Sequence, residues 1–171
     1  RVLTPGTLAE PELLDGKLEN LLCGVYWQGD QGAAAFLEVS TGAFWVRHWS
    51  DPALAWEDIS LAAPREALLL GDQIPELVRQ RLEASTSCTT DVERSLLEGG
   101  GRAAEALEHQ FGGAKLRGFG LEPDDAAVVA AWSTLDYARE AARVELAHVR
   151  EIEVRESSGA VVLDESTVRN L

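Results

Sequence analysis

The sequence predicts an α/β domain built on a mixed sheet, in which three antiparallel strands are followed by parallel strands and helices flank the sheet. Turn signals at 29–32 and 40–42 divide residues 20–49 into three strand-like runs, because glycine supplies the positive φ of a tight turn without a Cβ clash. The short apolar run 67–71 comes after a helical stretch. That order is typical of a crossover to a buried parallel strand.

The three runs within residues 20–49 favour strands on composition. They are rich in Val, Phe, Trp and Tyr, which fit a pleated and half-buried surface. In the register that we expect, Glu38 lies in the middle of the second strand, opposite Cys23 and Trp45. The other elements are predicted to pack around this meander.

Two helix signals follow the meander. Asp51 and Pro52 predict an N-cap and a first helical residue, and the helix ends before Pro64. A second helix begins near Pro75. Its apolar residues are Leu77, Val78 and Leu82.

The middle of the chain is less regular. Residues 84–90 have the β-branched content of a further strand, and the pattern turns helical from Asp91 until the glycines of 99–101 interrupt it. We predict a loop or hinge there, because each glycine costs a helix about 1 kcal/mol relative to alanine. A helix over 102–110 follows and ends at Phe111, before two glycines.

The clearest helix opens at Pro123, with Asp124 and Asp125 in its first turn. Arg139 and Arg143 lie near its end, so both sets of charges suit the helix dipole. A stripe of apolar residues is expected to face the core: Ala127, Val128, Ala131, Trp132, Leu135 and Ala138.

The two ends of the sequence indicate a longer protein. The chain holds no Met, begins at Arg1 and stops at Leu171, just after a predicted helix start. Residues 152–163, before that start, have the pattern of a hairpin. We expect an excised segment whose tail opens a second domain.

The composition restricts what the chain can bind by itself. The formal net charge of its 171 residues is −14, whereas affinity for a phosphate backbone comes mainly from Lys and Arg, so we expect no direct binding to DNA. No apolar run approaches the roughly 20 residues that span a bilayer, and the start lacks signal-peptide features. We therefore expect a cytoplasmic protein with no membrane partner, in which Cys23 and Cys88 are buried or idle thiols.

The predicted chain order is that of a ribonuclease-H-like sheet, so the enzymatic hypothesis is a two-metal nuclease. Such a site needs several carboxylates that converge on two cations about 4 Å apart. The first strand, 21–28, holds none, and Glu38 is a lone carboxylate. We expect neighbouring backbone groups to satisfy Glu38, while a metal-dependent nuclease that uses it stays open as an alternative. A stand-alone, unrelated acidic binding domain is a further alternative.

Other catalytic motifs are missing from the sequence. No serine lies in a GxSxG turn, and His48, His109 and His148 have no neighbouring partner pattern. The glycines of 99–101 and 118–120 follow neither of the two phosphate-binding patterns, GxxxxGK[ST] and GxGxxG. We therefore assign no catalytic, cofactor-binding or metal-binding residue.

Short motifs spread over the whole chain carry a family resemblance. They are RVLTPGT at 1–7, LEVSTGAF at 37–44, FG at 111–112, GFGLE at 118–122, DYA at 136–138, HVREI at 148–152 and LDESTVRNL at 163–171. In this order and spacing the chain resembles the bacterial DNA mismatch-repair family MutS. The resemblance divides it into a linker from the mismatch-reading domain (1–18), the connector domain (19–146) and the start of the core domain (147–171).

The resemblance implies a connector of ribonuclease-H-like fold without nuclease activity. In that family the connector joins the mismatch-reading domain to the core and ATPase domains and offers a surface to MutL, the repair partner. ATP, Mg and the P-loop would belong to the parent protein, not to this segment. DNA would be bound only through the parent, which is expected to be a homodimer or homo-oligomer.

Four positions depart from the family pattern. Ala141 and Ala142 stand where a Thr-Gln pair is usual, Ala147 where Pro is usual, and Val168 where a second Arg is usual. These departures concern the joint between connector and core.

For the MutL surface, the residues that we select lie on the predicted helix 102–110. They are Glu105, Glu108 and His109. The competing interpretation is an ordinary solvated helix face.

Overall fold

A mixed sheet forms the centre of the computed structural model, which describes residues 20–86, 88–94, 97 and 99–158. Its strands are β1 (Leu21–Gln28), β2 (Gln31–Glu38), β3 (Ala43–Trp49), β4 (Glu66–Leu70), β5 (Cys88–Val92) and β6 (Glu153–Val154), in the spatial order β5-β4-β1-β2-β3-β6. The first three strands are antiparallel, β4 is parallel to β1, β5 to β4, and β6 to β3. This confirms the predicted ribonuclease-H-like α/β fold.

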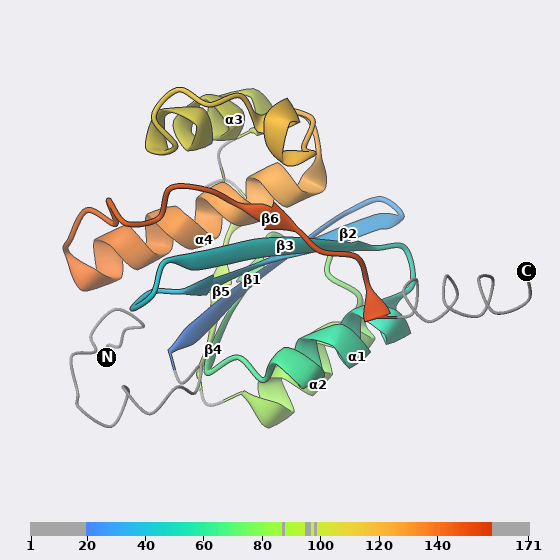
Figure 1. The fold of residues 1–171 in the computed structure, drawn as a ribbon. Coiled ribbons are helices and arrows are strands. Elements are labelled where there is room, and N and C mark those ends of the chain that lie inside the picture. Colours follow the sequence, from blue (N-terminus) through green and yellow to red (C-terminus); the bar gives the residue numbers. More distant parts are fainter. Residues whose placement is uncertain (1–19, 87, 95–96, 98, 159–171) are drawn as a thin grey trace, which may run out of the picture.

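The helices form layers on both sides of the sheet (Figure 1). Helices α1 (Pro52–Ala62) and α2 (Glu76–Ser85) cover one face, and α4 (Ala126–Ala142) covers the other. Helix α3 (Gly100–Gln110) packs on α4 as an outer layer and is followed by the 3-10 helix η3 (Leu116–Phe119). The sheet therefore has two apolar cores, one on each face.

A two-residue turn fixes the register of the meander. Gly29 has φ +61°, and Gln28 pairs with Gln31 across it. A turn of this length matches the right-handed twist of the flanking strands and demands positive φ, which glycine adopts at little cost.

The predicted register of Glu38 is wrong. Glu38 is the last residue of β2 and pairs with Leu21 and Ala43. Phe36 is the residue that lies opposite Cys23 and Trp45. The first turn has two residues instead of the four that our register implied, and the second loop spans residues 39–42, so each pairing moves by two residues and keeps its face of the sheet.

Close packing between β1 and α4 depends on a glycine. A Cβ added to Gly24 would lie 2.0 Å from Oγ1 of Thr134. Thr134 is buried and donates its hydroxyl to the Ala130 carbonyl, 2.7 Å away. The bare backbone of β1 thus lets α4 approach the middle of the sheet.

The predicted start of the first helix is confirmed. Asp51 accepts the Ala53 N–H at 2.9 Å, Pro52 is the first helical residue, and Ala63 ends the helix in the left-handed region. The apolar strand before the second helix is β4, whose five residues are all buried. In α2, Val78 and Leu82 are buried, whereas Leu77 is 40% exposed and lies off the core side.

The start predicted for the clearest helix is wrong by three residues. Asp125 is the N-cap of α4 and accepts the Ala127 N–H at 2.9 Å, so Pro123 and Asp124 precede the helix. The predicted stripe is confirmed, with Trp132 partly buried. Burial extends beyond that stripe because α4 lies between the sheet and α3.

The region 84–101 differs most from the prediction. Helix α2 continues to Ser85, and the further strand is β5, which includes Asp91 and Val92. Parallel pairing with β4 overrides the local helical pattern there. Gly99 is the N-cap of α3, so the predicted loop or hinge forms the start of a helix.

The last described strand closes one edge of the sheet. In β6, Glu153 and Val154 pair with Trp45 and Val46 of β3. The first arm of the predicted hairpin is thus an edge strand, and the second arm, 160–163, lies outside the described residues, as do Val168 and the linker 1–18. The division into three domains stays a prediction.

Candidate functional site

The outer side of α3 holds two of the three residues predicted to bind a partner. Glu105 and His109 are exposed and lie one helical turn apart. The opposite side of the helix packs in the core through Ala103, Ala104 and Leu107. The helix therefore presents a charged face to solvent while its other face is fixed.

Glu108, the third residue, has a structural role. Its carboxylate accepts the backbone N–H of Leu116 at 2.9 Å and lies 3.4 Å from Nζ of Lys115. The bond from Leu116 and the nearby Lys115 charge lower the pKa of Glu108 below its ordinary value. Because this side chain fastens η3 to α3, it is not a free part of the surface. Leu116 follows the turn at 111–113, so the sequence pattern of the helix alone could not reveal its bond to Glu108.

The C-terminal end of α3 is held by further contacts. The Phe111 ring packs edge-on against Phe44 of β3 and Phe119 of η3, with centroid distances of 6.5 and 5.3 Å. The Gln110 side chain reaches the segment after α4, where Nε2 lies 2.8 Å from the Leu146 carbonyl oxygen and 3.0 Å from that of Val149. The proposed surface thus belongs to a helix with a fixed end.

The other two histidines join elements of the fold. His48 of β3 lies 2.7 Å from a carboxylate oxygen of Asp125, and His148 lies 2.6 Å from the Val39 carbonyl oxygen. Burial would raise the pKa of Asp125, but the hydrogen bonds from His48 and from the Ala127 N–H lower it below its ordinary value. Both histidines thus have hydrogen-bonding partners within the fold.

Glu38 is satisfied by its neighbour, as predicted. Its carboxylate accepts both the backbone N–H of Ser40, at 3.1 Å, and the Ser40 hydroxyl, at 2.6 Å. Of the two thiols, Cys23 is buried, which raises its pKa, and Cys88 is half-buried.

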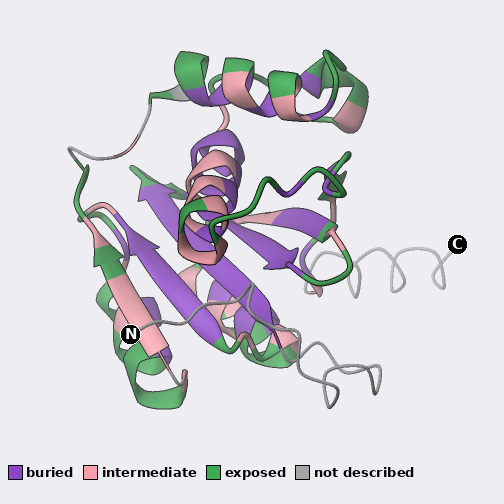
Figure 2. Ribbon diagram, turned by 90° about the vertical axis from the view of Figure 1, so that its left-hand side faces the viewer, coloured by how far each residue is buried: buried purple, intermediate pink, exposed green. Residues whose placement is uncertain are grey.

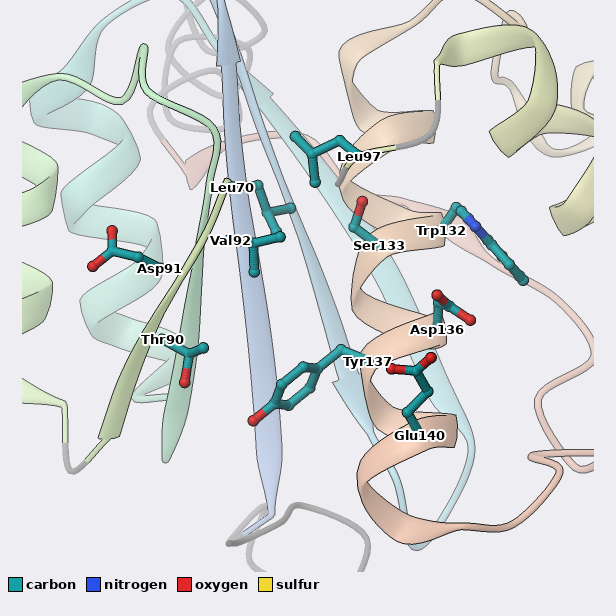
Figure 3. A pocket seen from close by; sticks show the side chains of 10 residues that line it. All are labelled: Leu70, Thr90, Asp91, Val92, Leu97, Trp132, Ser133, Asp136, Tyr137 and Glu140. Carbon is teal, nitrogen blue, oxygen red and sulfur yellow. The ribbon is translucent and has the colours of Figure 1, made fainter. Parts of the chain in front are cut away.

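A cleft of about 380 Å³ lies between β5 and α4 (Figure 3). Its lining includes Asp136 and Glu140 of α4 and Asp91 of β5, but the Asp91 side chain turns away from α4 and binds Arg79 of α2 at 2.6 Å. Glu38, at the end of β2, alternates with Leu37 and so lies on the α1 and α2 face. The carboxylates therefore do not converge, and the described part of the chain holds no group of three or more His, Cys, Asp or Glu placed to bind a metal ion.

Most of the residues that form this fold match a known protein family. The family described as MutS domain II matches residues 20–150. A relative named DNA mismatch repair protein MutS, from Symbiobacterium thermophilum, is 33% identical over 178 residues, and one of the same name from Desulfatibacillum aliphaticivorans is 31% identical over 175. Both alignments cover all of this chain, which spans about a fifth of the length of these relatives (20% and 19%).

Proposed function

Because this chain belongs to the MutS family, matching its domain II, we propose that it is the connector of a MutS-type DNA mismatch-recognition ATPase. In this role it joins the mismatch-reading domain to the core and ATPase domains. The observation that carries the proposal is the match over 20–150, which spans the sheet from β1 to the segment after α4.

The connector itself is proposed to be non-catalytic and to act in the cytoplasm. Supporting the first point, Glu38 lies on the α1 and α2 face of the sheet, whereas Asp136 and Glu140 belong to α4, which covers the other face. Among the described residues no helix is long and apolar enough to cross a bilayer. ATP and Mg would be bound by other parts of the parent protein. With a net charge of −14, the segment would meet DNA only through the parent, a proposed homo-oligomer.

The outer face of α3 is the proposed docking surface for a MutL-type partner. Glu105 offers a charge that a basic group of the partner could complement, and charges at the rim of an interface chiefly change the association rate and its salt dependence. Glu108 is left out of the surface because it holds Leu116.

A binding titration tests the proposed function. The 171-residue chain is titrated at low salt with the ATPase domain of a MutL-type protein, and in parallel with matched and mismatched duplex DNA. We expect saturable binding to the MutL-type domain and none to either duplex. Tight DNA binding without MutL binding would contradict both the connector assignment and the charge argument.

A charge-reversal pair locates the surface. Glu105→Lys on α3 is compared with Glu57→Lys, an exposed acidic residue of α1 on the opposite side of the sheet. We expect Glu105→Lys to weaken binding about tenfold at low salt and Glu57→Lys to leave it unchanged. Equal affinities for the two variants would remove α3 as the docking surface.

A further inference from the structure

The segment by which the chain leaves the sheet is built into the core. We call residues 146–158 the exit segment. Leu146, Val149 and Ile152 are buried in the apolar core on the α4 face. A flexible linker would not bury three apolar side chains at regular spacing.

Polar contacts hold the start of the exit segment to α3 and to the meander. A glutamine amide has two N–H donors, and Nε2 of Gln110 lies within hydrogen-bonding distance of two carbonyls, those of Leu146 and Val149. Between these two residues in the sequence, the His148 ring is hydrogen-bonded to the Val39 carbonyl. Gly42 leaves room for it, since an added Cβ there would lie 2.9 Å from the His148 ring.

The rest of the exit segment lies along β3 and reaches α1. The Arg155 N–H donates to the Val46 carbonyl at 2.9 Å, and the Arg155 guanidinium lies 4.0 Å from the centroid of the Trp45 ring. At its end, the Ser158 N–H donates to the buried carboxylate of Asp58 at 3.1 Å, and the Ser158 hydroxyl donates to the same carboxylate. These contacts attach the exit segment to β3 and α1 as well as to α3.

We propose that Gln110 couples the outer face of α3 to the exit segment, so that a partner bound at Glu105 and His109 holds that segment in its docked position. Gln110 follows His109 directly in α3, and the end of this helix is fixed by Phe111. A partner that stabilises α3 in this position therefore stabilises the two carbonyl contacts as well. This inference rests on the proposed function and deepens it, because it assigns the connector a way to transmit partner binding.

Such coupling requires two states of the exit segment, docked and undocked, and a partner that favours one of them. A partner that binds α3 better in the docked state shifts the chain toward it. By linkage, docking of the exit segment strengthens partner binding by the same factor. Removing the Gln110 amide therefore removes the side-chain contacts between α3 and the exit segment at one residue.

Residue-resolved hydrogen exchange of the 171-residue chain tests the role of Gln110 first. We expect Gln110→Ala to speed exchange at residues 146–150 about fivefold, the effect of losing roughly one hydrogen bond. Gln110→Glu, which keeps the size but loses the donors, gives a second variant in case the first unfolds. Gln80→Ala, which removes an exposed glutamine bonded to Glu76 on α2, is the matched control. Unchanged exchange at 146–150 in both Gln110 variants would overturn the proposal.

The second arm adds the ATPase domain of the MutL-type protein at saturation. In the unsubstituted chain we expect exchange at 146–150 to slow about tenfold, a typical coupling between sites. In the Gln110 variants the partner still binds, because Glu105 and His109 are intact, but exchange no longer responds. Binding without any slowing in the unsubstituted chain would overturn the inference and leave the proposed function standing. Absence of binding would overturn both.

Discussion

The two edges of the sheet are completed in different ways. At the β3 edge, β6 and the exit segment add a pairing partner, with Arg155 over the Trp45 ring and Ser158 bound to Asp58. At the opposite edge, β5 is half-buried, and no strand of the described residues pairs with its outer side. In Figure 2, β5 is coloured intermediate and exposed, whereas the central strands are buried.

The contrast separates two uses of a sheet edge. An open edge leaves backbone N–H and C=O groups to water, and its polar side chains contribute little to stability. At the closed edge, the contacts that stabilise the fold also fix the position of the exit segment as far as Ser158. Substitutions should therefore cost more at the β3 edge than at the β5 edge.

The largest loss is expected from Leu146→Ala in the exit segment. Leu146 is 1% exposed, and truncating a fully buried leucine costs about 2–5 kcal/mol through lost transfer free energy and the cavity left behind. Denaturant unfolding measures the change. The control is Leu77→Ala, at a residue 40% exposed on α2, which should cost under about 1 kcal/mol. Similar losses for the two variants would mean that the exit segment is not part of the core.

The next largest loss is expected from Asp58→Ala on α1. The buried carboxylate accepts the Trp49 indole N–H at 2.7 Å as well as the Ser158 N–H. Hydrogen bonds to a charged group are each worth about 1.5–3 kcal/mol, so we expect a loss of about 2 kcal/mol in the free energy of unfolding. The exposed neighbour supplies the control, Glu57→Ala, which should change stability by less than about 0.5 kcal/mol. A neutral Asp58→Ala would contradict the role of this carboxylate.

A smaller, pH-dependent loss is expected where β3 meets α4. The pKa of Asp125 is lowered from its ordinary 3.8 by its bonds to His48 and the Ala127 N–H, against the opposing effect of burial. The ionised group therefore contributes stability above pH 3.8, and this contribution disappears as the pH falls through the lower folded-state pKa.

Asp125→Asn tests that contribution, since asparagine is also a good N-cap. We expect it to lower stability by up to about 1 kcal/mol at pH 7, with the difference from the unsubstituted chain shrinking in unfolding measurements as the pH falls below 3.8. If the two chains still differed in stability at low pH, the loss would be due to packing and not to the charge of Asp125.

The smallest effect is expected at the open edge. Asp91 of β5 binds Arg79 at 2.6 Å but is 68% exposed, and exposed ion pairs contribute about 0–1 kcal/mol. Asp91→Asn should change the unfolding free energy by less than about 0.5 kcal/mol, and less still at high salt. A loss above 1 kcal/mol in the same denaturant experiment would erase the difference between the edges.

Local sequence signals predicted most of the fold, but they could not predict contacts between residues far apart in the sequence. Turn glycines and the Asp51-Pro52 pair depend on neighbouring residues, so the meander and the start of α1 could be predicted. The register of Glu38 could not, because turn length was ambiguous. Gln110 bonds to carbonyls 36 and 39 residues away, and Asp58 to a residue 100 positions away. Such partners follow from the folded topology and have no local pattern.

Residue-resolved hydrogen exchange on the unsubstituted chain, without any partner, tests the central claim that the chain leaves this domain as a fixed part of the sheet. The N–H groups of Val149 and Arg155 donate to the carbonyls of Leu146 and Val46. The account predicts that these two amides exchange more slowly than the amides of β5, which open locally at a free edge. Exchange at Val149 and Arg155 as fast as in an unstructured peptide would contradict it, and would make the exit segment a flexible linker.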